Sequence, residues 1–135
     1  MAFFILGGVT AMGKMKVVVL EPMKEAYLVE IENDLSDMQK VVGGYIQGIY
    51  PFEEEVCLVV NEEGKINGLP LNRALFDDSG KVYDIIAGTA FICSCSEDSF
   101  DSLSKDHQEK FLDMFKHPET FVSMNGEIVA IPIKG

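Results

Sequence analysis

Arg73 is the residue that most constrains the fold of this chain, because it stands in an apolar stretch of an acidic protein. Four of its neighbours within residues 69–75 are leucine or alanine. A guanidinium in such surroundings needs a carboxylate, a backbone carbonyl or a ligand anion, because an unpaired buried charge costs too much to keep. We therefore expect a definite counterpart, which is either internal, such as Asp84 or other hydrogen-bonding groups, or a ligand from outside.

Short β-branched runs separated by turns predict a fold rich in strands. Residues 16–20 are typical of a buried strand, and the alternation in residues 27–32 predicts a second strand that forms a hairpin with it. Asn33 and Asp34 favour the start of a helix with an apolar stripe. Residues 43–44 are glycines, which end that helix.

The rest of the chain continues this mixture. Further strands are predicted at residues 45–50, 56–60, 82–86 and 89–93. Residues 69–75 contain a proline followed by good helix formers, which predicts one helical turn carrying Arg73. Ser102 or Ser104 begins a last amphipathic helix. Residues 125–126 are Asn-Gly, which indicates a type I′ turn in a C-terminal hairpin.

This order of elements predicts an α+β fold in a single domain, residues 15–135, with one mainly antiparallel β-sheet, two amphipathic helices and a C-terminal β-hairpin. Residues 1–14 are interpreted as an apolar N-terminal extension. It is shorter than the roughly 20 apolar residues that span a bilayer, and no cation precedes its apolar run, so neither a membrane anchor nor a signal peptide is expected.

Charge and cysteine content limit the partners. The chain has 11 Lys and Arg against 22 Asp and Glu, a net charge of -11 that opposes binding to nucleic acid or to a membrane. Cys57, Cys93 and Cys95 are an odd number without a framework spacing, which favours free thiols in a reducing cytoplasm. No second ligand pair completes a metal site, so neither a metal nor another cofactor is expected.

An enzymatic role has few candidates. It would use Arg73 to hold an anion, Asn72 to orient it, and Tyr83 or Asp84 as acid–base groups. Both histidines are expected to be solvated, and no nucleophile motif is present. A small enzyme with an anion site at Arg73 is therefore an alternative rather than the favoured hypothesis.

A binding or adaptor module, with a protein or a small molecule as its partner, is the favoured hypothesis. Tyr50 and Phe52 could form an exposed contact patch, although aromatic residues at strand ends also complete cores. Arg73, Asn72, Tyr83 and Asp84 are the other candidate binding residues. Homo-oligomerisation through a sheet edge or the extension is compatible with this reading.

The acidic residues suggest a further alternative, a DNA mimic or other anti-defence inhibitor that imitates the charge of a duplex. The competing interpretation is that these carboxylates are solvated turns and a helix face. The candidates are Glu53, Glu54, Glu55, Glu62, Glu63, Asp77, Asp78, Glu97, Asp98, Asp101, Asp106, Glu109 and Asp113.

Several blocks of sequence resemble one family when taken in order and spacing. They are residues 43–46, 50–52, 61–65, 69–75 and 84–89. Together they are similar to the bacterial and phage family called domain of unknown function 3846, over about Met15 to Thr120. The resemblance implies a small domain in a bacterial, phage or mobile-element context, and it implies no reaction. The extension and the hairpin at residues 125–126 lie outside it.

Overall fold

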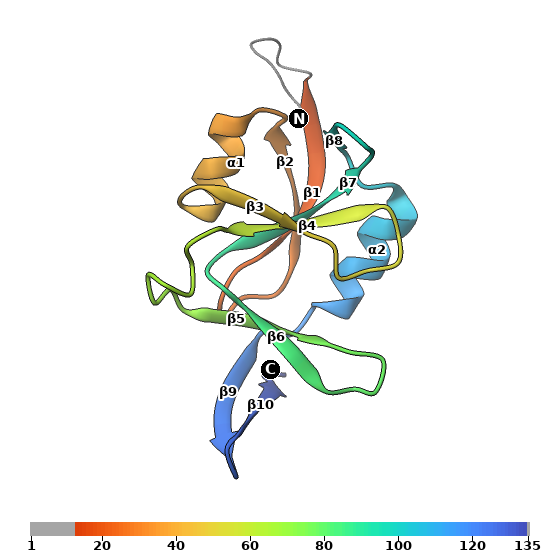
Figure 1. The fold of residues 1–135 in the computed structure, drawn as a ribbon. Helices are drawn as coiled ribbons and strands as arrows, with labels where there is room; N and C mark the ends of the chain where they lie inside the picture. Colours follow the sequence, from red (N-terminus) through yellow and green to blue (C-terminus); the bar gives the residue numbers. More distant parts are fainter. Residues whose placement is uncertain (1–12, 135) are drawn as a thin grey trace.

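A computed structural model describes residues 13–134 and shows an antiparallel sheet flanked by two helices and two hairpins (Figure 1). The main sheet has six strands in the order β2-β1-β7-β4-β3, with β8 paired to β7. These strands are β1 (Lys14–Leu20), β2 (Tyr27–Glu32), β3 (Ile46–Ile49), β4 (Val56–Asn61), β7 (Ala90–Cys95) and β8 (Phe100–Asp101).

The alternation of β1 places its side chains in two cores, one on each face of this sheet. Val17 and Val19 belong to the cluster that includes Met38 of α1 (Leu35–Val42). Val18 and Leu20 belong to the cluster that includes residues of α2 (Lys105–Met114). The two helices therefore cover opposite faces, and the central strands are buried on both sides.

Local capping signals account for the helix ends. Asp34 is the N-cap of α1 and accepts a hydrogen bond from the Asp37 amide at 2.8 Å, and Gly43 ends the helix with φ 79°. Ser104 caps α2 by accepting from the His107 amide at 3.2 Å. The expectation of solvated histidines is wrong for His107, because its Nδ1 is buried without a hydrogen-bond partner in residues 13–134.

Two further sheets are separate hairpins. One pairs β5 (Leu71–Phe76) with β6 (Val82–Ala87), and the other pairs β9 (Glu119–Met124) with β10 (Glu127–Pro132). The predicted helical turn at residues 69–75 is wrong, since most of it lies in β5. The strands also divide into three antiparallel sheets rather than the one predicted.

The predicted C-terminal hairpin is confirmed, with φ 53° at Asn125 and 81° at Gly126, as a type I′ turn requires. The α+β class with two helices is also confirmed. Residues 1–12 of the predicted extension lie outside the described residues, and Lys14 already belongs to β1. Within residues 13–134 no helix has the length and apolar character needed to cross a membrane.

Candidate binding groove

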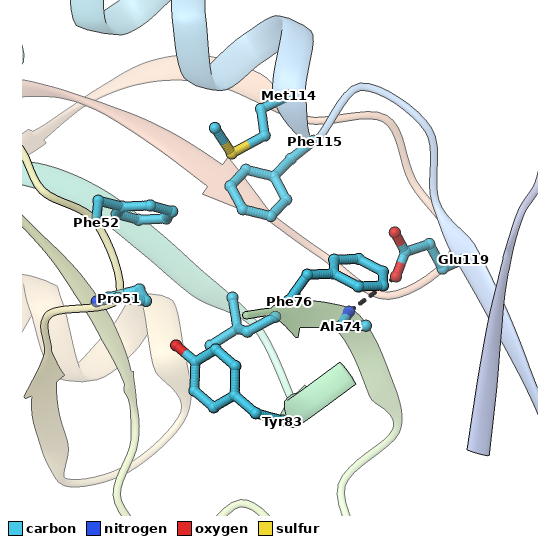
Figure 2. A pocket seen from close by; sticks show the side chains of 9 residues that line it. Pro51, Phe52, Ala74, Phe76, Tyr83, Met114, Phe115 and Glu119 are labelled. Carbon is cyan, nitrogen blue, oxygen red and sulfur yellow. Dashed lines mark hydrogen bonds between the residues drawn. The ribbon is translucent and has the colours of Figure 1, made fainter. Parts of the chain in front are cut away.

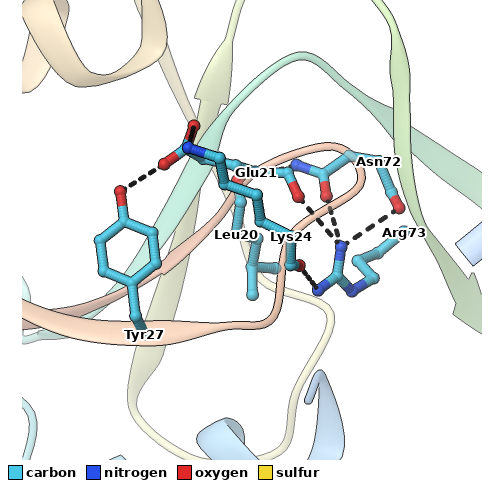
Figure 3. Close-up of polar contacts among 6 residues, drawn as sticks. All are labelled: Leu20, Glu21, Lys24, Tyr27, Asn72 and Arg73. Atoms are coloured by element: carbon cyan, nitrogen blue, oxygen red, sulfur yellow. Dashed lines mark hydrogen bonds and ion pairs between the residues drawn. The ribbon is translucent and has the colours of Figure 1, made fainter. Parts of the chain in front are cut away.

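Arg73 is completely buried, and its counterparts are oxygen atoms of the chain itself (Figure 3). Its Nε and Nη2 donate to the Phe115 carbonyl at 3.2 and 2.9 Å, and Nη2 also donates to the Lys24 carbonyl at 2.7 Å. Its Nη1 donates to the Glu21 carbonyl at 3.3 Å and to Asn72 Oδ1 at 2.9 Å. The guanidinium thus joins β5 to the β1–β2 turn and to the end of α2.

Asn72 completes this network and is also fully buried. Its Nδ2 donates to the carbonyls of Leu20 and Gly88, both at 2.8 Å, while its Oδ1 accepts from Arg73. Every polar atom of the Asn72 amide therefore has a partner, which is the condition under which a buried amide stabilises a fold.

A β-bulge explains why two neighbouring residues of one strand both point inward. Leu71 pairs with Ala87 and Ala74 pairs with Ile85, so β5 spans three steps (74 − 71) where β6 spans two (87 − 85). The extra residue redirects the side chains that follow it. As a result residues 72–75 are all buried, instead of alternating between the core and the solvent.

The end of α2 supplies a favourable place for this cation. Phe115 is the C-cap of α2, and the last carbonyls of a helix lack partners within it and carry partial negative charge. Burial lowers the pKa of Arg73, and the nearby Glu119 carboxylate opposes this shift. Arginine remains protonated under all ordinary conditions, so the network holds a charged group.

The predicted pairing of Arg73 with Asp84 is wrong. Asp84 forms an ion pair with Lys65 and accepts a hydrogen bond from the Ile85 amide at 2.8 Å. Asp84 and Lys65 help to line a cavity of about 320 Å³, and Arg73 is not among its lining residues. The hypothesis of internal hydrogen bonds is the one that the geometry supports, although they hold a strand rather than a helical turn.

A groove with a cavity volume of about 230 Å³ lies where the β5–β6 hairpin, the loop after β3 and the end of α2 meet (Figure 2). It is lined by Pro51, Phe52, Ala74, Leu75, Phe76, Tyr83, Met114, Phe115 and Glu119. Three of its large side chains stay about half exposed, namely Phe76 at 51%, Tyr83 at 54% and Met114 at 49%. Their convergence on one hollow distinguishes them from apolar residues scattered over a surface.

Aromatic packing makes one wall of the groove rigid. The Phe52 ring lies 4.7 Å from the ring of Phe111 and 6.1 Å from that of Phe115, measured between centroids. Phe111 is fully buried in the core, and such tilted and edge-on contacts are favourable. This wall is therefore fixed before any ligand arrives.

Among residues 13–134, Glu119 is the only acidic residue that lines the groove, and Figure 2 shows it beyond the Phe76 ring. Its Oε1 accepts a hydrogen bond from the Ala74 amide at 2.8 Å, and no bond to its Oε2 is found within residues 13–134. Burial raises the pKa of Glu119, while the Ala74 hydrogen bond and the charge of Arg73 oppose the shift.

The predicted site residues do not form one site. Phe52 and Tyr83 line the groove together, whereas Arg73 and Asn72 lie in the polar network next to Ala74 and do not line it. Asp84 belongs to the second cavity. Tyr50 is 65% exposed and does not line the groove either, although it immediately precedes Pro51.

Sequence reasoning missed seven of the nine residues that line the groove, among them Phe76, Met114 and Glu119. Phe76 ends a strand just before a turn, and Met114 falls at the last position of α2. Both positions are visible in the sequence as apolar residues at element ends. No local signal brings Glu119 to the same place, because its contact with Ala74 spans 45 residues.

Comparison with known proteins identifies a family but no function. The model described as "Domain of unknown function (DUF3846)" matches residues 15–116 of the chain. No curated protein and no solved structure matches it. The matched region ends before β9, so the C-terminal hairpin and Glu119 lie beyond it. In residues 13–134 no group of three or more His, Cys, Asp or Glu side chains is placed to hold a metal ion.

Proposed function

Because the chain belongs to the DUF3846 family, whose description carries no activity, we propose from the geometry that it is a protein-binding module. Its contact site is the groove between the β5–β6 hairpin, the loop after β3 and α2. A side chain of the partner enters this groove, and the surrounding loops contact the rest of the partner segment. Tyr83 and Phe52, predicted from the sequence, act here together with Phe76 and Met114.

The observation that carries this proposal is the exposure of Phe76, Tyr83 and Met114 around one cavity. Aromatic residues and methionine are enriched in the contact patches of binding proteins. A partner would cover this exposed apolar surface. Its removal from water would contribute favourably to binding.

Arg73 and Asn72 support this site without touching the ligand. Arg73 holds the carbonyl of Phe115 and precedes Ala74, and both of these residues line the groove. The network fixes the distance between β5 and α2, which form opposite walls. A preformed site loses less conformational entropy when it binds.

Site-specific photo-cross-linking tests the proposal. The photoreactive residue p-benzoylphenylalanine is placed at Tyr83, in cells that express the chain. It is expected to give a discrete cross-linked product that excess unmodified chain suppresses and that Phe76→Ala removes. Circular dichroism of purified Phe76→Ala should show an intact fold, because Phe76 lies at an exposed strand end.

The matched control places the same photoreactive residue at Leu71, which lies on β5 of the same hairpin, is 42% exposed and does not line the groove. Cross-linking from Leu71 should be absent or should survive Phe76→Ala. The proposal is wrong if the two positions give the same products, or if Phe76→Ala leaves the Tyr83 product unchanged.

The alternatives have less support. A catalytic site at Arg73 would need Arg73, Tyr83 and Asp84 in one open cleft, and the described residues place them in three different environments. For the DNA mimic, several of the carboxylates have local partners: Glu54 pairs with Lys110, and Asp77 accepts from the Ser79 and Lys81 amides. Mimicry and homo-oligomerisation stay predictions from the sequence.

A further inference from the structure

We infer that the groove takes a cationic side chain, Lys or Arg, from a basic segment of the partner protein. This inference rests on the proposed function and adds the chemical class of the ligand. The aliphatic stem of the side chain packs on Phe76 and Met114, and its charged head lies between the aromatic faces and Glu119.

The walls of the groove have the two features that attract a cation. Aromatic faces carry negative potential, and a cation within about 6 Å of a ring centroid is attracted to it. Phe76 and Tyr83 present half-exposed rings, and the Glu119 carboxylate lies beside Phe76 with Oε2 available within the described residues (Figure 2). A lysine or arginine side chain has a long apolar stem and a charged end. The stem can pack on the rings while the charge lies near the carboxylate.

The same combination already holds a lysine of the chain itself. The Nζ of Lys110 lies 5.6 Å from the centroid of the Phe111 ring and forms an ion pair with Glu54. Phe111 in turn packs on Phe52, a wall of the groove. An aromatic ring with a carboxylate nearby is thus an arrangement that this part of the molecule uses for a cation.

Charge around the groove favours a basic partner over a neutral or acidic one. Glu53 and Glu55 follow Phe52 in the chain, and Asp77 and Asp78 follow Phe76. All four are exposed, and none forms an ion pair in residues 13–134. With a net charge of -11 the whole molecule attracts cationic segments and repels anionic ones.

Amide NMR spectroscopy with small capped probes tests the inference directly. The ¹⁵N-labelled protein is titrated with the N-acetyl methylamides of lysine, arginine and norleucine, the last being a neutral isostere of the lysine stem. The amides of Ala74, Phe76 and Tyr83 report groove occupancy. We expect the cationic probes to bind about fivefold or more tightly than norleucine, from the attraction of rings and carboxylate for the cation.

Glu119→Gln is the key variant, because glutamine keeps an acceptor for the Ala74 amide while removing the charge. It should abolish most of the preference for cations. Glu127→Gln, on β10 and outside the groove, removes the same charge from the molecule and should leave the preference unchanged. Amide dispersion in each spectrum verifies that the variant is folded. The preference for cations is itself measured on the wild-type protein, so it does not depend on any variant being folded.

The outcomes separate this inference from the proposed function. If norleucine shifts the groove amides and binds as tightly as lysine, the groove binds an apolar side chain, so the cation inference is wrong while the proposed function stands. If no probe shifts the groove amides, the cation inference is also wrong, and the cross-linking experiment then decides the proposed function. A preference that persists in Glu119→Gln overturns the role of the carboxylate.

Discussion

At the scale of single residues, Arg73 donates hydrogen bonds to backbone carbonyls of two distant segments, the β1–β2 turn and the end of α2. An arginine among leucines predicts a buried counterpart on energetic grounds, and the structure provides one. The identity of that counterpart was not predictable, because the acceptor carbonyls of Glu21, Lys24 and Phe115 lie 52, 49 and 42 residues away. Backbone carbonyls also have no sequence signature, whereas Asp84 was a nearby carboxylate.

Glu119 gives a pH-dependent prediction. Its raised pKa means that the folded protein keeps this proton to a higher pH than the unfolded chain does, so stability falls as pH rises from the unfolded pKa through the folded one. Glu119→Gln does not titrate. Urea unfolding should therefore show the variant gaining stability relative to wild type as the pH rises above the unfolded pKa of glutamate, about 4.3.

Below the unfolded pKa the carboxyl group is protonated in both states, so the relative stability should stop changing there. Glu127→Gln controls for the loss of one negative charge. A difference between Glu119→Gln and wild type that stays constant with pH would contradict the assigned pKa direction.

The three cysteines should react in a fixed order. Burial raises the pKa of Cys57 to about 12 and raises that of Cys93 well above its usual value, and both side chains are fully buried. Cys95 is partly exposed, and burial and the Glu55 carboxylate raise its pKa as well. Since the thiolate is the reactive form, a disulfide reagent should label Cys95 first in the native protein.

Titration with a chromogenic disulfide before and after denaturation measures this order. Cys95→Ser should remove the native-state reaction, and unfolding should release the remaining thiols. Fast native labelling of Cys57 would show that the β4–β7 core opens readily.

At the scale of elements, local signals predicted where helices and turns begin and end better than they predicted the type of secondary structure. The cap at Asp34, the left-handed Gly43 and the turn at residues 125–126 were all predicted, because each depends on a few adjacent residues. The helical turn predicted for residues 69–75 was wrong, because most of this segment lies in β5. Pairing with β6 and the bulge at Asn72 and Arg73 outweighed the helix propensity of this segment.

The N-cap of α1 allows a direct measurement of such a local signal. Asp34→Ala removes the acceptor for the Asp37 amide and should lower the free energy of unfolding by about 1 kcal/mol. Asp34→Asn keeps an acceptor and should lose much less. Urea unfolding of the two variants tests the prediction, which fails if alanine and asparagine are equally stable.

At the scale of the whole molecule, the assembly of three sheets lay beyond sequence patterns. Alternation and turns predicted most strands, and the α+β class followed from their order. The groove could not be predicted in this way, because its walls come from the loop after β3, the β5–β6 hairpin, α2 and β9. Only Phe52 and Tyr83 among the predicted residues line it. Long-range convergence of this kind depends on the complete fold.

Arg73 connects these parts, since its guanidinium binds the β1–β2 turn, β5 and the end of α2 at once. Its removal would take the arginine donors away from two buried acceptors, the Phe115 carbonyl and Asn72 Oδ1, and from the part-buried carbonyl of Lys24. The central claim is that this arginine supports the fold of the groove and does not itself bind the ligand.

The free energy of unfolding of Arg73→Met, measured by urea denaturation beside Phe76→Ala, tests this claim most directly. The account predicts a loss of about 3 kcal/mol or more for Arg73→Met, because the Phe115 carbonyl and Asn72 Oδ1 stay buried without their arginine donors. Phe76→Ala, at an exposed groove position, should stay within about 1 kcal/mol of wild type. An Arg73→Met protein as stable as wild type that has lost only its ligand would contradict the account.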